Sequence, residues 1–145
     1  MHHNLEWMHI LKLEHSTSTF DTDPFEPQPD SIRTIFPFYV ADSRHVNGGF
    51  VELPYTLVQD STLYFVLGER TPQIWLEKIE FIKQYYGMAL VNTHPDYLKE
   101  PALFKIYRDF LEIMKENDEY WHALPRQVAH WWRERSKSKA FKMSI

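Results

Sequence analysis

Three segments in the second half of the chain show the apolar spacing of amphipathic helices. Residues 72–86, 101–116 and 125–135 each begin at a proline and carry apolar side chains three and four positions apart. Proline suits the first helical position because its ring already fixes the backbone torsion that a helix needs. The pattern therefore predicts three helices, the first of which ends before Gly87.

Shorter β-prone runs lie before and between these helices. They occupy residues 16–20, 88–93 and 120–124. From residue 72 onward the order is helix, strand, helix, strand, helix, which is typical of a parallel α/β sheet or barrel. We therefore expect an α/β fold in which the three runs are strands of one parallel sheet with the helices on its outer face.

The first half of the chain carries weaker signals. Asn4 is placed to cap a short helix, and the turn at 47–49 allows 50–53 to pair back on the run 34–40, which Pro37 interrupts. The apolar run 60–68 fits a strand or a short buried helix equally well. We expect one domain over residues 1–135, followed by a frayed tail over 136–145.

Composition narrows the class of protein. The chain has 145 residues, a formal net charge of −4 and no cysteine, so disulfides and thiolate metal sites are excluded. The basic cluster at 133–142 is expected to be a solvated tail, and nucleic acid is not the expected partner. There is no apolar run of membrane-spanning length, and the first residues lack the features of a signal peptide. As written, the sequence is expected to be cytoplasmic.

His94 is the main candidate for chemistry. The apolar residues 88–91 run into a polar cluster that stops at Pro95, as a buried strand does when it ends at an active face. A histidine in that place can act as a general acid or base, ligate a metal or hold a loop by a hydrogen bond. From the residues alone, all three roles remain open.

Acidic and aromatic residues provide further candidates. Asp21, Asp23 and Glu26 lie in a proline-rich loop, which either preorganises the three carboxylates or is a turn in which Asp21 and Asp23 cap backbone amides. If the predicted strands are parallel, this loop, the segment 94–97 and His122 all lie on one rim, and the carboxylate that orients His94 comes from Asp21, Asp23 or Asp96. Four aromatic residues are candidates for stacking on sugar rings: Phe25, Tyr55, Tyr97 and Trp121.

Five pieces of the chain suggest a family when they are taken together and in order. They are residues 18–27, 49–55, 59–60, 88–97 and 120–125. In this arrangement the chain resembles the C-terminal half of a polysaccharide deacetylase of the NodB-homology type. The resemblance implies the C-terminal portion of a distorted, TIM-like (β/α) barrel that removes N- or O-acetyl groups from sugar polymers with the help of a divalent metal such as zinc.

The resemblance also assigns roles to residues. It makes His94 the general acid and makes Asp21 and Asp23 supporting carboxylates. The two motifs that supply the family's catalytic base and metal ligands do not occur in the sequence, so no metal ligand is expected in this chain. We therefore expect a fragment that is inactive in isolation, or alternatively a non-catalytic carbohydrate-binding module. The expected partners are an acetylated polysaccharide and the missing N-terminal half or a second copy.

Overall fold

The chain folds into a mixed α/β structure. The computed structural model describes residues 4–26, 28–44 and 48–137. Its helices and strands are β1 (His15–Ser16), β2 (Phe38–Ala41), β3 (Gly49–Glu52), α1 (Gln73–Gln84), α2 (Pro101–Lys115) and α3 (Pro125–Lys137). Four short 3-10 or π-helical turns complete the described elements: η1 (Leu5–Leu11), η2 (Gln28–Asp30), η3 (Thr62–Val66) and η4 (Tyr97–Lys99).

The three predicted helices are confirmed. α1, α2 and α3 begin at or one residue after the prolines that predicted them, and α3 continues to Lys137. Most of the predicted tail lies outside the described residues. In α1 the buried side chains are Trp75, Ile79 and Ile82, which follow the helical period.

The predicted hairpin is also confirmed. β2 pairs antiparallel with β3, and β2 begins immediately after Pro37. Gly49 opens β3 with φ +140°, where a Cβ atom would stand 2.3 Å from the carbonyl oxygen of Val40. Glycine is therefore required at this close approach of two strands.

The prediction of one parallel sheet over 16–20, 88–93 and 120–124 is only partly right. β1 does run parallel to β3, in a sheet of order β1-β3-β2. Beyond these strands the same two segments stay parallel, with one bridge between Phe20 and Tyr55. Residues 88–93 make one parallel bridge, between Val91 and Leu57. Residues 120–124 form no strand. The aromatic run that suggested one is largely exposed, so no burial drives it into a sheet.

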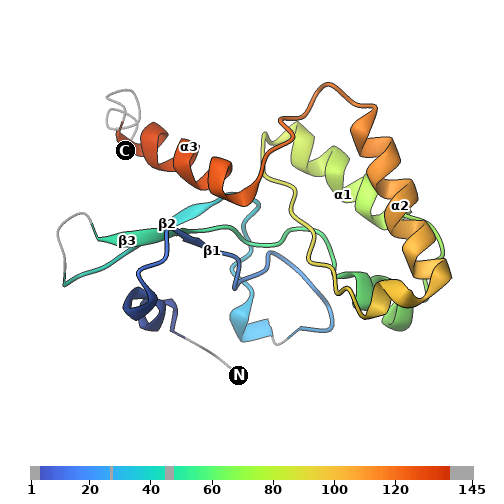
Figure 1. Ribbon diagram of the computed structural model, residues 1–145, viewed down its shortest axis with the longest axis horizontal. Helices are drawn as coiled ribbons and strands as arrows, with labels where there is room; N and C mark the ends of the chain where they lie inside the picture. The colour runs from blue at the N-terminus through green and yellow to red at the C-terminus, as the bar shows by residue number, and fades with distance from the viewer. Residues whose placement is uncertain (1–3, 27, 45–47, 138–145) are drawn as a thin grey trace.

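Two apolar clusters hold the elements together. One lies between α1, α2 and the chain around Leu57, with the rings of Trp75 and Phe110 packed at 5.0 Å. The other joins β3 to α3 through Val51, Leu53 and Ala129. Figure 1 shows α1 and α2 side by side at one end of the molecule, with α3 on one side of the small sheet and η1 on the other.

Candidate functional site

His94 lies where two extended segments end together. The chain at 88–92 runs beside 56–60, with the Thr56 amide donating to the carbonyl of Leu90 at 2.9 Å. Beyond this contact Asp60 enters the helical turn that continues as η3, and the other segment turns away at Pro95. The open question about residues 60–68 is thus answered in favour of a helix. The two segment ends bring Asp60 and His94 face to face.

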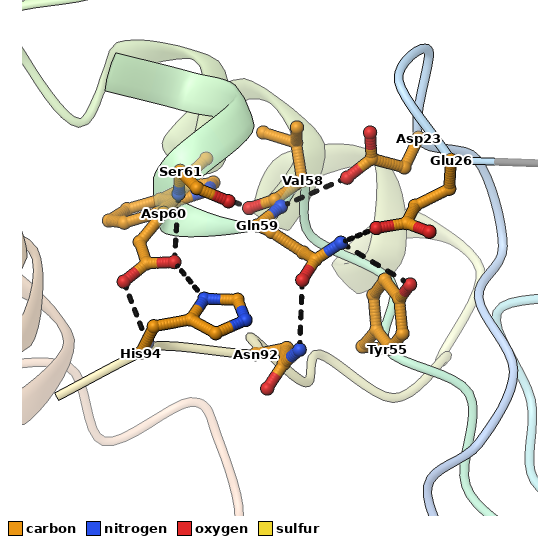
Figure 2. Close-up of polar contacts among 10 residues, drawn as sticks. Asp23, Glu26, Tyr55, Val58, Gln59, Asp60, Ser61, Asn92 and His94 are labelled. Atoms are coloured by element: carbon orange, nitrogen blue, oxygen red, sulfur yellow. Dashed lines mark hydrogen bonds and ion pairs between the residues drawn. The ribbon is translucent and has the colours of Figure 1, made fainter. Parts of the chain in front are cut away.

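Asp60 and His94 form the central contact of the site (Figure 2). The Nδ1–H group of His94 donates to Oδ1 of Asp60 at 2.7 Å, and the His94 backbone amide donates to Oδ2 at 2.8 Å. The Asp60 side chain is fully buried, whereas that of His94 is 39% exposed. Because a carboxylate can only accept here, Nδ1 carries the proton and Nε2 is left for exchange with a ligand or solvent.

A third donor fixes the Asp60 carboxylate. The backbone amide of Ser61 donates to Oδ1 at 2.8 Å. Backbone amides therefore hold both oxygens of the carboxylate, in addition to the imidazole. On the other side of the ring, Tyr97 packs against His94 with centroids 5.1 Å apart, and Phe65 packs against Tyr97 at 5.6 Å. The imidazole is thereby oriented by a buried anion and flanked by a half-exposed aromatic pair.

The orienting carboxylate is not one of the three that the sequence suggested. Asp21 is buried and paired with Lys78 of α1 at 2.6 Å, and the exposed Asp96 is paired with Lys99 at 2.8 Å. Asp23 is buried too, and it accepts from the backbone amides of Phe25 at 3.0 Å and Gln59 at 3.2 Å. Asp21 thus ties the loop to α1, and Asp23 contacts the site through the backbone amide of Gln59, the residue before Asp60.

Asp60 could not be singled out from its neighbours in sequence. It lies 34 residues from His94 in a run whose secondary structure was ambiguous. The available signal was the polar pair Gln59-Asp60 after the apolar Leu57-Val58, which is the same pattern as the end of the His94 segment. Two such changes from apolar to polar residues indicate two extended segments that end at the same edge of a sheet.

A polar network around Gln59 lies next to the pair of Asp60 and His94 (Figure 2). The Gln59 side-chain amide donates to the Glu26 carboxylate, and more weakly to the Tyr55 hydroxyl at 3.5 Å, while its oxygen accepts from the amide of Asn92 at 2.9 Å. Burial and the nearby carboxylates of Glu26, Asp23 and Asp30 raise the pKa of Tyr55. Tyr55 therefore remains a neutral phenol over the whole physiological range.

The four candidate stacking residues do not form one surface. Tyr97 lies against His94, Tyr55 is stacked on Phe20 at 5.6 Å, and Phe25 is 68% exposed on the loop beside Glu26. Trp121 is 59% exposed in the linker that follows α2, and it contacts Trp131 of α3. His122 lies in the same linker, where its Nε2 meets the carbonyl of Asn117 at 3.2 Å. The expected single rim is thus wrong for this linker.

Within residues 4–26, 28–44 and 48–137, no three histidine, aspartate or glutamate side chains lie close enough together to hold a metal ion. In the same ranges no helix combines the length and apolarity needed to cross a membrane.

The structure describes one group that is well arranged for proton transfer. It consists of Asp60 and His94, with Tyr97 against the imidazole ring and Gln59 beside Asp60. A half-exposed imidazole on a buried carboxylate can give and take a proton at Nε2. Comparison of the chain with protein-family models, with curated proteins and with solved structures yields no match.

Proposed function

We propose that this chain is the C-terminal portion of a metal-dependent polysaccharide deacetylase and that His94 is its proton donor. The observation that carries the proposal is the buried Asp60 carboxylate that holds Nδ1 of the half-exposed His94 at 2.7 Å. In this proposal the parallel segments at 15–21, 49–58 and 88–92 belong to a partial (β/α) barrel. The remaining strands come from an N-terminal half or from a second copy of the chain.

The chemistry of deacetylation explains why such a pair is useful. Hydrolysis of an acetamide or acetate ester passes through a tetrahedral intermediate, whose nitrogen or oxygen leaving group must receive a proton. An imidazolium at His94 donates that proton from Nε2. The Asp60 carboxylate keeps the ring oriented through Nδ1 and stabilises its positive charge while the proton is still bound.

The metal that the resemblance implies does not fit the residues described. No group of three suitable ligands exists within those residues, so the proposal assigns the metal ligands and the catalytic base to the segment or partner that completes the barrel. Asp21 and Asp23 act as structural supports of the site in this proposal, because their carboxylates are engaged by Lys78 and by backbone amides.

The substrate is proposed to be an acetylated polysaccharide that lies over His94 and Tyr97. Tyr97 offers a half-exposed aromatic ring beside the proton donor, and Phe25 offers a second exposed ring on the neighbouring loop. A non-catalytic carbohydrate-binding module is the second candidate function. The exposed rings of Phe25 and Tyr97 support that candidate.

A titration with acetylated chitooligosaccharide in EDTA tests whether this surface binds sugar. The expected result is a shift of the His94 and Tyr97 ring resonances in NMR spectra. A titration that moves only the signals of Trp121, or none at all, contradicts the proposed site. Acetate release by a longer product of the same gene, lost on His94→Ala, then separates the enzyme from the binding module.

A further inference from the structure

The side chain of Gln59 stands between the loop that carries Phe25 and the segment that carries His94 (Figure 2). We propose that Gln59 is a positioning residue that couples the loop 21–26 to the segment end 92–94. Through this coupling the backbone that carries the exposed Phe25 ring keeps a fixed place relative to the imidazole of His94. The inference rests on the proposed function, in which His94 donates the proton and Phe25 contacts sugar.

On the loop side, Gln59 makes two contacts. Its backbone amide donates to Oδ2 of Asp23 at 3.2 Å, and its side-chain Nε2 donates to the Glu26 carboxylate. Asp23 in turn accepts from the backbone amide of Phe25 through Oδ1. The residues on both sides of Phe25 are therefore tied to Gln59.

On the His94 side, the same residue and its neighbour make the matching contacts. Oε1 of Gln59 accepts from Nδ2 of Asn92 at 2.9 Å, and the Asp60 amide donates to the Asn92 carbonyl at 3.4 Å. Two residues later, the backbone and the ring of His94 both bind the Asp60 carboxylate. The segment 92–94 is thus held to residues 59 and 60 at both of its ends.

The amide of Gln59 can serve both sides in only one orientation. Glu26 offers only acceptors, so Nε2 must face the loop, and the amide nitrogen of Asn92 offers only donors, so Oε1 must face Asn92. Gln59 is also buried, which strengthens its hydrogen bonds and makes an unpaired partner costly. A movement of the loop away from Gln59 therefore disturbs the His94 segment as well.

Native-state hydrogen exchange of two backbone amides tests this coupling. The Phe25 amide reports on the loop, and the His94 amide, which donates to Asp60, reports on the proton donor. Glu26→Ala removes the acceptor on the loop side of Gln59, opposite the side that holds the His94 segment. The expected result is that protection of both amides falls, with that of His94 falling about tenfold, equivalent to about 1.4 kcal/mol.

A reciprocal exchange of the two side chains provides the rescue. Gln59→Glu places two carboxylates against each other and is expected to lower the protection of both amides. Combining it with Glu26→Gln restores an amide–carboxylate pair in the reverse sense. The new amide at position 26 would donate to the new carboxylate at position 59, and Asn92 could still donate to that same carboxylate. The double variant is expected to return the His94 amide to within about twofold of the original protection.

The matched control is Gln73→Glu on α1. Gln73 also donates its side-chain amide to a carboxylate, that of Glu77 at 2.9 Å, but on an exposed helical face. This change should leave both reporter amides as they were. Because Glu26 is only half-buried on a loop, Glu26→Ala remains informative if Gln59→Glu alone does not fold.

Two results would overturn the proposed coupling. A Glu26→Ala variant that loses protection at Phe25 but not at His94 overturns the coupling, as does a double variant no better protected than Gln59→Glu. The measurement involves neither sugar nor turnover, so its failure leaves His94 standing as the proton donor. Conversely, a protein that binds no sugar can still show the coupling, and then it is the proposed function that fails.

Discussion

The tautomer of His94 depends on a single carboxylate. With Asp60 accepting from Nδ1, the neutral ring has its free lone pair on Nε2, which is the nitrogen turned away from the Asp60 carboxylate. Asp60→Asn replaces one acceptor oxygen by an NH₂ group, so we expect a larger share of the neutral ring to carry its proton on Nε2. Long-range proton–nitrogen NMR spectra above the titration range of histidine measure that share. An unchanged share in this variant would contradict the assigned role of Asp60.

Loss of the imidazole itself should cost little stability. His94→Ala leaves Asp60 with the backbone amides of Ser61 and residue 94, and the partly exposed position lets water reach the vacated space. We expect the free energy of unfolding in urea to fall by about 1 kcal/mol. His122→Ala, at an exposed position, is the control and should have no measurable effect. A fall of more than about 3 kcal/mol would make His94 chiefly a structural residue.

Tyr55 makes the fold sensitive to alkaline pH. Its pKa is raised above the ordinary value of 10.0 in the folded protein, by burial and then by the carboxylate of Glu26. Between the ordinary pKa of tyrosine in the unfolded chain and the raised pKa in the folded protein, Tyr55 has lost its proton only in the unfolded chain. The contribution of Tyr55 to stability is therefore constant below about pH 10 and falls above it. Unfolding curves should therefore show a steeper alkaline loss for the original protein than for Tyr55→Phe. Tyr86→Phe, at a highly exposed ring, should follow the original curve.

At the scale of elements, the sequence predicted helices better than strands because the signals for a helix lie within its own residues. A helix such as α2 is specified within its own residues, by Pro101 at its start and by an apolar stripe that includes Leu103, Ile106 and Phe110. The extended segments depend on contacts far along the chain. Residues 18 and 19, for example, donate their backbone amides to the buried carboxylate of Glu52, which no local pattern announces.

The segment 88–92 illustrates how a side chain can replace part of a strand ladder. The Thr56 hydroxyl donates to the carbonyl of Met88 at 2.9 Å and accepts from the amide of Leu90 at 3.0 Å. Thr56→Val keeps the shape but removes both bonds, so we expect the free energy of unfolding to fall by about 1–3 kcal/mol. Chemical denaturation measures this loss. Thr22→Val, on an exposed loop, serves as control, and equal effects of the two changes would show that the hydroxyl bonds contribute nothing.

At the scale of the whole molecule, the proposed proton donor His94 lies in a part of the chain whose described residues form no group that could hold a metal to activate water. The purified chain alone is therefore expected to release no acetate from acetylated chitooligosaccharides, with or without zinc or cobalt, since its described residues include no three-ligand group. Enzymatic measurement of acetate checks this. Metal-dependent release above that of a His94→Ala sample would show that the chain is complete as a catalyst.

The length of α2 has a further consequence for a polymeric ligand. This helix of 15 residues, about 22 Å long, lies in the chain between Tyr97, which precedes it, and Trp121, which follows it. If these rings bind sugar, as proposed, a short oligosaccharide would contact the ring at only one end of the helix at a time. A chain long enough to reach both would make its second contact intramolecularly, with an effective concentration set by the helix. Apparent affinity would then rise steeply above a threshold of polymer length, although neither aromatic surface had itself become a better binder.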